Sequence, residues 1–190
     1  LALSADSQLG AVPGVATPGH LLLDGGTLQA DAGFTLAAAR GLQLGAGGGT
    51  VAVPGGQQLA FAGVLSGLSA DPAQGALTKA GDGQLALSGA NTFAGATRVR
   101  AGSLAIDGDA QLGDAPASAT PGHLLLDGGR LQVAGSTTLA ASRGIALGAS
   151  GAVLDIAAGA TVAYNGALAD VPGAAGGIDK AGAAAGQLQR

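Results

Sequence analysis

The sequence predicts an all-β fold, a parallel β-solenoid of stacked coils, from three observations. These are a long internal repeat, short stretches in which apolar and polar residues alternate, and glycine-rich corners between those stretches. The composition agrees: 37 of the 190 residues are Gly, all twelve acidic residues are Asp, and Lys occurs only twice. Glu and Lys favour helices whereas Gly and Asp do not, so an α-rich fold is disfavoured. A 47% apolar content argues against disorder.

The repeat has an offset of 103 residues. Residues 17–26 return unchanged as residues 120–129, and 30 of the 49 positions in 1–49 are identical in 104–152. Such self-similarity is typical of solenoids and other repeat architectures. We therefore expect two tandem units in one continuous β-helix: a first unit over residues 1–103 and a second, incomplete unit over residues 104–190.

Within each unit the hydrophobic period is two. Residues 58–63, 84–89 and 161–166 alternate, as in QLALSG, which predicts strands with one buried and one solvated face. Corners such as Asp24-Gly25-Gly26 separate them. A sandwich or barrel would also have short strands, but tandem units with few length changes and small aliphatic residues favour a solenoid. With ~20 residues per coil, a unit is about five coils and the chain about nine, a rod roughly 45 Å long.

Several classes of site are excluded or disfavoured by the sequence. There is no Cys, so disulfides and thiolate metal sites are impossible, and a net charge of −4 gives no basic footprint for nucleic acid. The chain contains no run of 18 apolar residues, no P-loop and no GxSxG elbow. We expect no catalytic, cofactor or metal site. Because it begins at Leu1 without Met, we also expect it to be a fragment of a longer protein.

The polar residues most open to a functional interpretation are better explained as structural. His20 and His123 are repeat equivalents that follow Pro-Gly, so about five coils should separate them, too far for one metal ion. Paired carboxylates can serve glycosidases, but Asp107, Asp109 and Asp114 are more simply corner or solvent-facing residues.

Four basic residues are also expected to be structural. Arg98 and Arg100 should point outward as a solvated, salt-linked pair. Lys79 and Lys180 occupy equivalent positions, and we expect the ammonium of each to stay in water while its stem lies on apolar surface.

Residues 77–104 resemble the autotransporter-associated β-strand repeat, also called the passenger-associated transport repeat. The matching positions are Leu77, Lys79, Gly81, Gly83, Leu85, Leu87, Gly89, Asn91, Phe93, Gly95, Thr97, Val99, Gly102 and Leu104. The resemblance implies a right-handed parallel β-helix, export through an outer-membrane β-barrel translocator outside this chain, and a place at the bacterial cell surface. It also implies that the motif serves passenger folding and secretion. A second copy of the motif degenerates at residues 183–185.

Three functions fit such a passenger rod. The first is an adhesive or self-associating segment that contacts a host-cell or matrix surface or sister passengers. The second is a structural stalk that carries a distal effector and aids secretion. The third is a solenoid enzyme acting on polysaccharide, which near-identical units without aromatic sugar platforms argue against. We therefore expect no enzymatic activity, no cofactor and no nucleic-acid partner. The feature that separates the first two functions is the outer face: an exposed row of Asp or Arg that differs between copies favours binding, and uniform outer faces favour a spacer.

Overall fold

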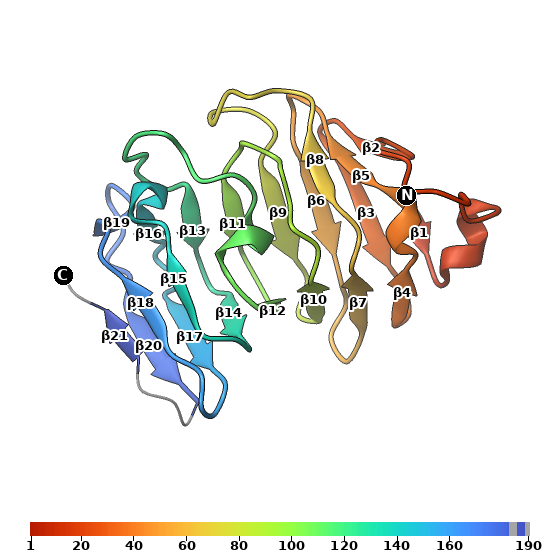
Figure 1. The fold of residues 1–190 in the computed structure, drawn as a ribbon. Helices are drawn as coiled ribbons and strands as arrows, with labels where there is room; N and C mark the ends of the chain where they lie inside the picture. Colours follow the sequence, from red (N-terminus) through yellow and green to blue (C-terminus); the bar gives the residue numbers. More distant parts are fainter. Residues whose placement is uncertain (183–185, 189–190) are drawn as a thin grey trace.

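The computed structural model, which describes residues 1–182 and 186–188, is a parallel β-solenoid of about seven turns (Figure 1). Every strand pairing is parallel, and the part of the chain that the structure describes contains short 3-10 helices but no α-helix. This confirms the predicted fold class. The degenerate motif copy at residues 183–185 lies outside the described residues.

Each turn visits three faces of the rod. The first face is an eight-stranded sheet of β1 (Ala2–Leu3), β3 (Gly26–Ala30), β6 (Gly49–Ala52), β9 (Leu77–Ala80), β11 (Thr97–Val99), β13 (Leu124–Leu126), β16 (Ile145–Leu147) and β19 (Leu168–Asp170). The second face has seven strands: β4 (Phe34–Leu36), β7 (Gln58–Phe61), β10 (Gln84–Leu87), β12 (Ser103–Ile106), β14 (Arg130–Val133), β17 (Ala152–Ile156) and β20 (Ile178–Ala181).

The third face is interrupted. It begins with β2 (Leu21–Leu23), β5 (Leu42–Leu44) and β8 (Leu65–Gly67), and it ends with β15 (Thr137–Leu139), β18 (Val162–Tyr164) and β21 (Gly186–Leu188). Between these two sheets the face is carried by Thr92, which bridges to Ser66, and by the 3-10 helix η3 (Asp109–Leu112). The amide of Asn91 donates to Ala110 O, and the amide of Asp109 donates to Thr137 Oγ1, so the stacking continues through the gap.

Alternation places like residues above one another inside the rod. On the second face, Leu59 is in register with Leu85, Leu85 with Leu104, Leu104 with Leu131, and Leu131 with Leu154. All five leucines are buried. Each contributes about 1.5–3 kcal/mol on burial, and because neighbouring turns share the ladder, stability accumulates along the axis.

The turns are longer and fewer than expected. On the first face, the turn from Gly49 to Leu77 takes 28 residues, whereas the turn from Leu77 to Thr97 takes 20. The predicted length of ~20 residues per coil therefore fits the shorter of these two turns and not the longer one. Loops that leave the sheets, such as residues 68–76 and 113–123, account for the difference. The prediction of about nine coils was wrong. Seven turns at ~4.8 Å give a stacked length of roughly 34 Å rather than 45 Å.

Equivalent strands of the two repeat copies occupy different faces. β2 and β13 are 103 residues apart, yet β2 lies on the third face and β13 on the first. In the same way β3, on the first face, corresponds to β14 on the second, and β4, on the second, to β15 on the third. The third face is visited at β2, β5, β8, Thr92 and η3, and β13 follows one face later. One sequence repeat therefore spans four and one-third turns rather than about five whole coils. As a result, each strand of the second copy lies one face further round the rod than its counterpart in the first copy.

Candidate functional site

The residues of the repeat motif build the interior and the tight corners of the turns around the interruption. Leu77, Leu85, Leu87, Phe93, Val99 and Leu104 are all buried at 3% exposure or less. Gly81 has φ +72°, a conformation that favours glycine, and a side chain at Gly89 would collide with the backbone of Gly63 in the preceding turn. The motif glycines Gly83, Gly95 and Gly102 likewise lie against backbone of a neighbouring turn.

Asn91 replaces the missing strand of the third face. It is 4% exposed; its Oδ1 accepts from the amide of Leu65 at 2.8 Å, and its Nδ2 donates to Gln111 O at 2.7 Å. It thereby joins β8 to η3 across the gap. Thr97 adds a second bond in the same place, since its buried hydroxyl donates to Leu112 O at 3.2 Å. Because unpaired buried amides and carbonyls are costly, these two side chains stabilise the rod where ladder bonds are lacking.

Lys79 differs from the prediction. Its side chain is fully buried, and Nζ donates to Ala80 O at 2.8 Å, Gly81 O at 2.6 Å and Ala101 O at 3.2 Å. The ammonium therefore closes its own corner and ties it to the next turn instead of staying in water. Burial lowers the pKa of Lys79 to about 8, partly offset by the charge of Asp82. Its counterpart Lys180 makes the same local contacts, to Ala181 O and Gly182 O, but is exposed as expected.

Two buried arginines, which the sequence analysis missed, repeat the same bonding pattern. In the first copy, Arg40 binds the Asp6 carboxylate at 2.7 and 3.1 Å, Gly10 O at 2.7 Å and Leu9 O at 3.3 Å. Arg40 has no exposed surface. Its hydrogen bonds to Asp6 lower the pKa of that carboxyl.

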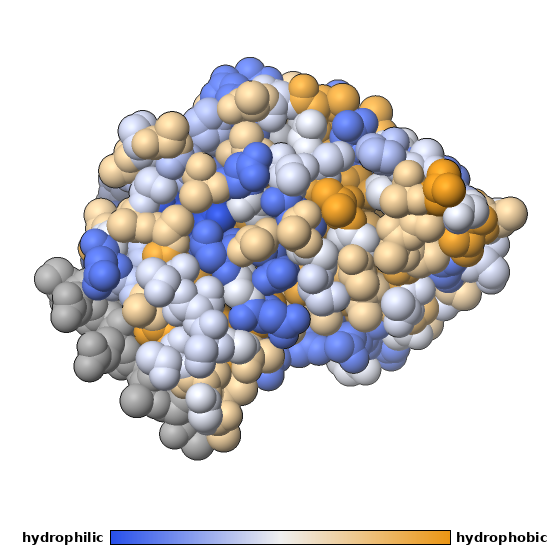
Figure 2. Space-filling model, in the orientation of Figure 1, coloured by the Kyte–Doolittle hydropathy of each residue, from blue (hydrophilic) through white to orange (hydrophobic). Residues whose placement is uncertain are grey.

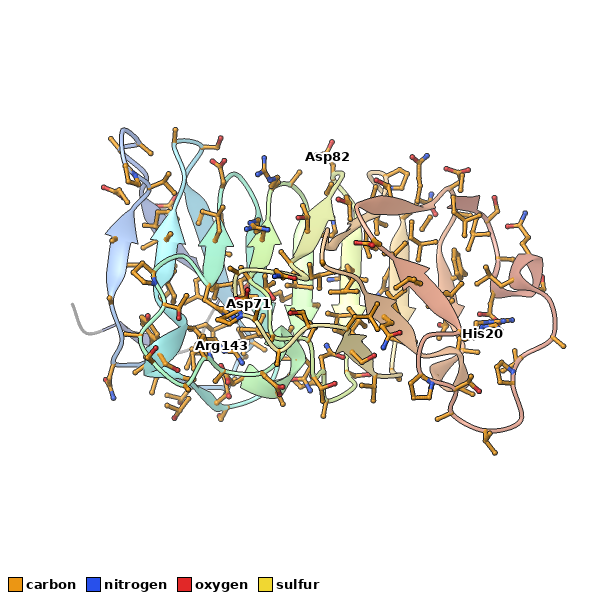
Figure 3. The ribbon with its side chains drawn as sticks, turned by 90° about the horizontal axis from the view of Figure 1, so that it is seen from above. His20, Asp71, Asp82 and Arg143 are labelled. Carbon is orange, nitrogen blue, oxygen red and sulfur yellow. The ribbon has the colours of Figure 1, made fainter. Side chains whose placement is uncertain are left out.

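In the second copy, Arg143 binds Asp109 at 2.8 and 3.0 Å, Gly113 O at 2.6 Å and Leu112 O at 3.2 Å. Figure 3 shows Arg143 inside the rod. Each arginine fixes a 3-10 helix of one turn to the next turn. The signal was present in the sequence, because both the Asp and the Arg recur at the 103-residue offset with the same spacing of 34.

The two histidines lie in different environments. His20 is exposed, near the N-terminal end of the rod, whereas His123 is buried, with Nε2 2.8 Å from Ala94 O and Nδ1 without a partner. Burial lowers the pKa of His123. Asp109 begins η3 and is partly exposed, and it pairs with Arg143, a partner that the sequence analysis did not foresee. Over residues 1–182 and 186–188, no three His, Cys, Asp or Glu side chains are grouped as metal ligands would be.

Ion pairs are sparse on the outer face of the described residues. Arg98 and Arg100 point away from the core as predicted, but neither forms an ion pair within the described part of the chain. The one exposed pair that the described residues contain joins Arg130 to Asp155 at 2.8 Å on the second face. The exposed charges are mostly aspartates, such as Asp82, so the surface is more acidic than basic.

The surface is hollowed at the corners that lead into the third face. An apolar hollow of about 490 Å³, which we call the corner hollow, is lined by Ala16, Thr17, Pro18, Ala38, Ala39, Gly41, Ala62, Gly63, Val64, Ser66 and Thr92. Thr92 also borders a more polar hollow of about 580 Å³ between the loops at residues 67–72 and 114–120. No charged side chain lines the corner hollow.

Comparison with known proteins places these features in a family. Residues 77–106 match the model of the passenger-associated transport repeat. The chain is also similar to the adhesin BmaC autotransporter of Brucella suis biovar 1 (strain 1330), with 36% identity in an alignment 178 residues long that covers 88% of the chain. The chain is a segment of an autotransporter passenger. This confirms the resemblance on which the sequence analysis relied, and it places the passenger segment at the cell surface or among secreted proteins.

The passenger segment spans about 5% of the length of that curated relative. No solved structure matches it. None of the helices in the described residues is long and apolar enough to cross a membrane.

Proposed function

We propose that this passenger segment is adhesive: a stiff surface-displayed rod whose outer face contacts host-cell or matrix surfaces. The observation that carries the proposal is the contrast between inside and outside. Both copies keep the buried arginines and the leucine ladder, whereas their exposed positions differ, as at Val15 and Ser118 or Val64 and Ala167. A spacer needs only a conserved interior to keep its turns stacked, whereas a binding surface favours outer faces that differ between the copies. The similarity to an adhesin over most of the chain supports the same role.

The proposed role is binding rather than catalysis. The most strongly bonded charged groups, Arg143 with Asp109 and Arg40 with Asp6, hold the turns together, and both arginines are inaccessible to a substrate. We further propose that an outer-membrane translocator delivers the passenger and that the motif at residues 77–104 supports its folding during export. Stacked turns fold from one end without gathering distant residues, which suits a chain that emerges gradually.

The test is capture of beads coated with the chain on host cells and on immobilised matrix glycoproteins. The matched control keeps every buried residue and exchanges the exposed loops of the two copies, with residues 11–16 and 114–119 in each other's place. Both loops are built on the same corner, so the control should fold. Capture that is strong for the chain and altered by the exchange supports adhesion. Absence of capture by either protein would contradict it.

A further inference from the structure

Among the residues whose side chains the structure describes, five of the six exposed large apolar ones surround the third face of the first copy. Leu22 lies on β2, Val64 and Leu68 flank β8, and Val12 and Val15 are on the loop that precedes β2. Val15 is the most exposed of all, at 75%, and Leu68 follows among these five at 60%. Figure 2 shows stronger hydrophobic colour over the N-terminal half of the molecule. Exposed apolar side chains that gather in this way mark an interaction surface.

The patch combines a protrusion with a hollow. The loop at residues 11–16 projects from the corner, and its last residue, Ala16, already lines the corner hollow. Its shape is fixed: the Thr17 hydroxyl donates to Val15 O at 3.0 Å, and the Thr17 amide donates to Ala39 O at 2.9 Å. Val15 is therefore presented on a braced loop beside a hollow of the same apolar chemistry.

The second copy has the same loop without the apolar side chains. Thr120 donates to Ser118 O at 3.0 Å and to Ser142 O at 2.8 Å, which repeats the bracing. Yet Ser118 stands at the position of Val15, Ala115 at that of Val12, and Ala167 at that of Val64. The solenoid therefore does not require the valines, which are specific to the exposed face of the first copy.

We propose that this face pairs with the same face of a second copy of the chain, the loop of each molecule inserting Val15 into the corner hollow of the other. A twofold axis between a protrusion and a neighbouring hollow produces two identical contacts at once. The absence of charged side chains from the hollow removes the repulsion that two chains of net charge −4 would otherwise meet at the contact. This pairing goes beyond the proposed adhesion to host-cell or matrix surfaces, because it adds a second passenger as a partner.

Sedimentation equilibrium of the chain at rising concentration tests the pairing. We expect dimers. In the double variant Val15→Ser with Val64→Ala, which puts second-copy surface residues into the first copy, the dissociation constant should be at least tenfold larger. Ser118→Ala with Ala167→Ser makes two changes at the equivalent surface positions of the second copy and should leave dimerisation unchanged. Circular dichroism should show both variants folded.

Cross-linking then locates the contact, because the chain has no Cys of its own. A Val15→Cys chain mixed with an Ala39→Cys chain should form a disulfide-linked heterodimer on oxidation, whereas a Ser118→Cys chain with the same partner should not. The proposal is overturned if the chain stays monomeric. It is also overturned if the dimer survives Val15→Ser with Val64→Ala, because a dimer formed by end-to-end stacking of strand edges would survive those substitutions. Bead capture on host or matrix surfaces that persists in that variant would leave the adhesive function standing without this pairing.

Discussion

The two copies of the repeat are alike inside and different outside. Arg40 and Arg143 make matching sets of hydrogen bonds, and the loops before β2 and β13 are braced in the same way. Their exposed positions have diverged from Val to Ser or Ala, and one of the two equivalent histidines is buried while the other is exposed. The interior is constrained by stacking against two neighbouring turns, whereas an outward side chain has no such partner. Differences between copies therefore identify the surface that evolution is free to use.

The largest effect should come from breaking the bonds that both copies retain. Replacing Arg143 by Met keeps its apolar stem but removes the guanidinium from the Asp109 carboxylate and from Gly113 O, while Leu112 O keeps the Thr97 hydroxyl. We expect a loss of about 3 kcal/mol in the free energy of unfolding, measured by urea denaturation. Arg40→Met should give a similar loss.

The control for the arginines is Arg130→Met. Arg130 pairs with Asp155, but its side chain is 42% exposed, so the loss should stay below about 1 kcal/mol. Equal losses for Arg143 and Arg130 would show that the buried arginines do not hold the turns together.

A smaller effect is expected where the copies differ by one hydroxyl. Tyr164 accepts from the amide of Ile145 at 3.2 Å and donates to Ala167 O at 2.8 Å, while its counterpart Phe61 packs at the same corner without these bonds. Tyr164→Phe should cost about 1 kcal/mol, since the first copy already accommodates Phe. A loss several times larger in the same denaturation assay would mean that the two corners are not equivalent.

Burial of His123 should make the stability of the chain depend on pH. Because burial lowers the pKa of His123 in the folded chain, the unfolded chain binds more protons below about pH 6.5. The stability that this group contributes is full above that pH and falls as the pH drops toward the folded-state value. Lowering the pH from 7 to 5 should therefore reduce the free energy of unfolding, and His123→Gln should make this loss smaller when urea denaturation is compared at the two pH values. An unchanged loss in His123→Gln would contradict this.

The smallest effect concerns the surface itself. Val15→Ser with Val64→Ala should change the free energy of unfolding at low protein concentration by no more than about 0.5 kcal/mol, because neither side chain belongs to the core. A large loss would mean that these valines serve folding, and their divergence between copies would need another explanation.

The sequence was sufficient for the fold class because period-two alternation and the 103-residue repeat are both visible in the order of the residues. It did not reveal the turn length, because loops such as residues 113–123 leave the sheet without changing the alternation beside them. The buried ammonium of Lys79 was also missed: its three acceptors, Ala80, Gly81 and Ala101, are backbone carbonyls, which any residue can supply. The corner hollow depends on how turns stack at a corner, and no single stretch of sequence encodes it.

The third of a turn left over in each repeat gives this rod the property of a screw thread. Duplicating one 103-residue unit would lengthen the rod by about 21 Å and would also swing everything beyond the insertion round by a third of a circle. Deleting a unit would rotate the distal part by a third of a circle in the opposite direction, and adding three units would return it to its original orientation. Gain or loss of a repeat by recombination would thus redirect the distal part of the passenger without altering a single one of its residues.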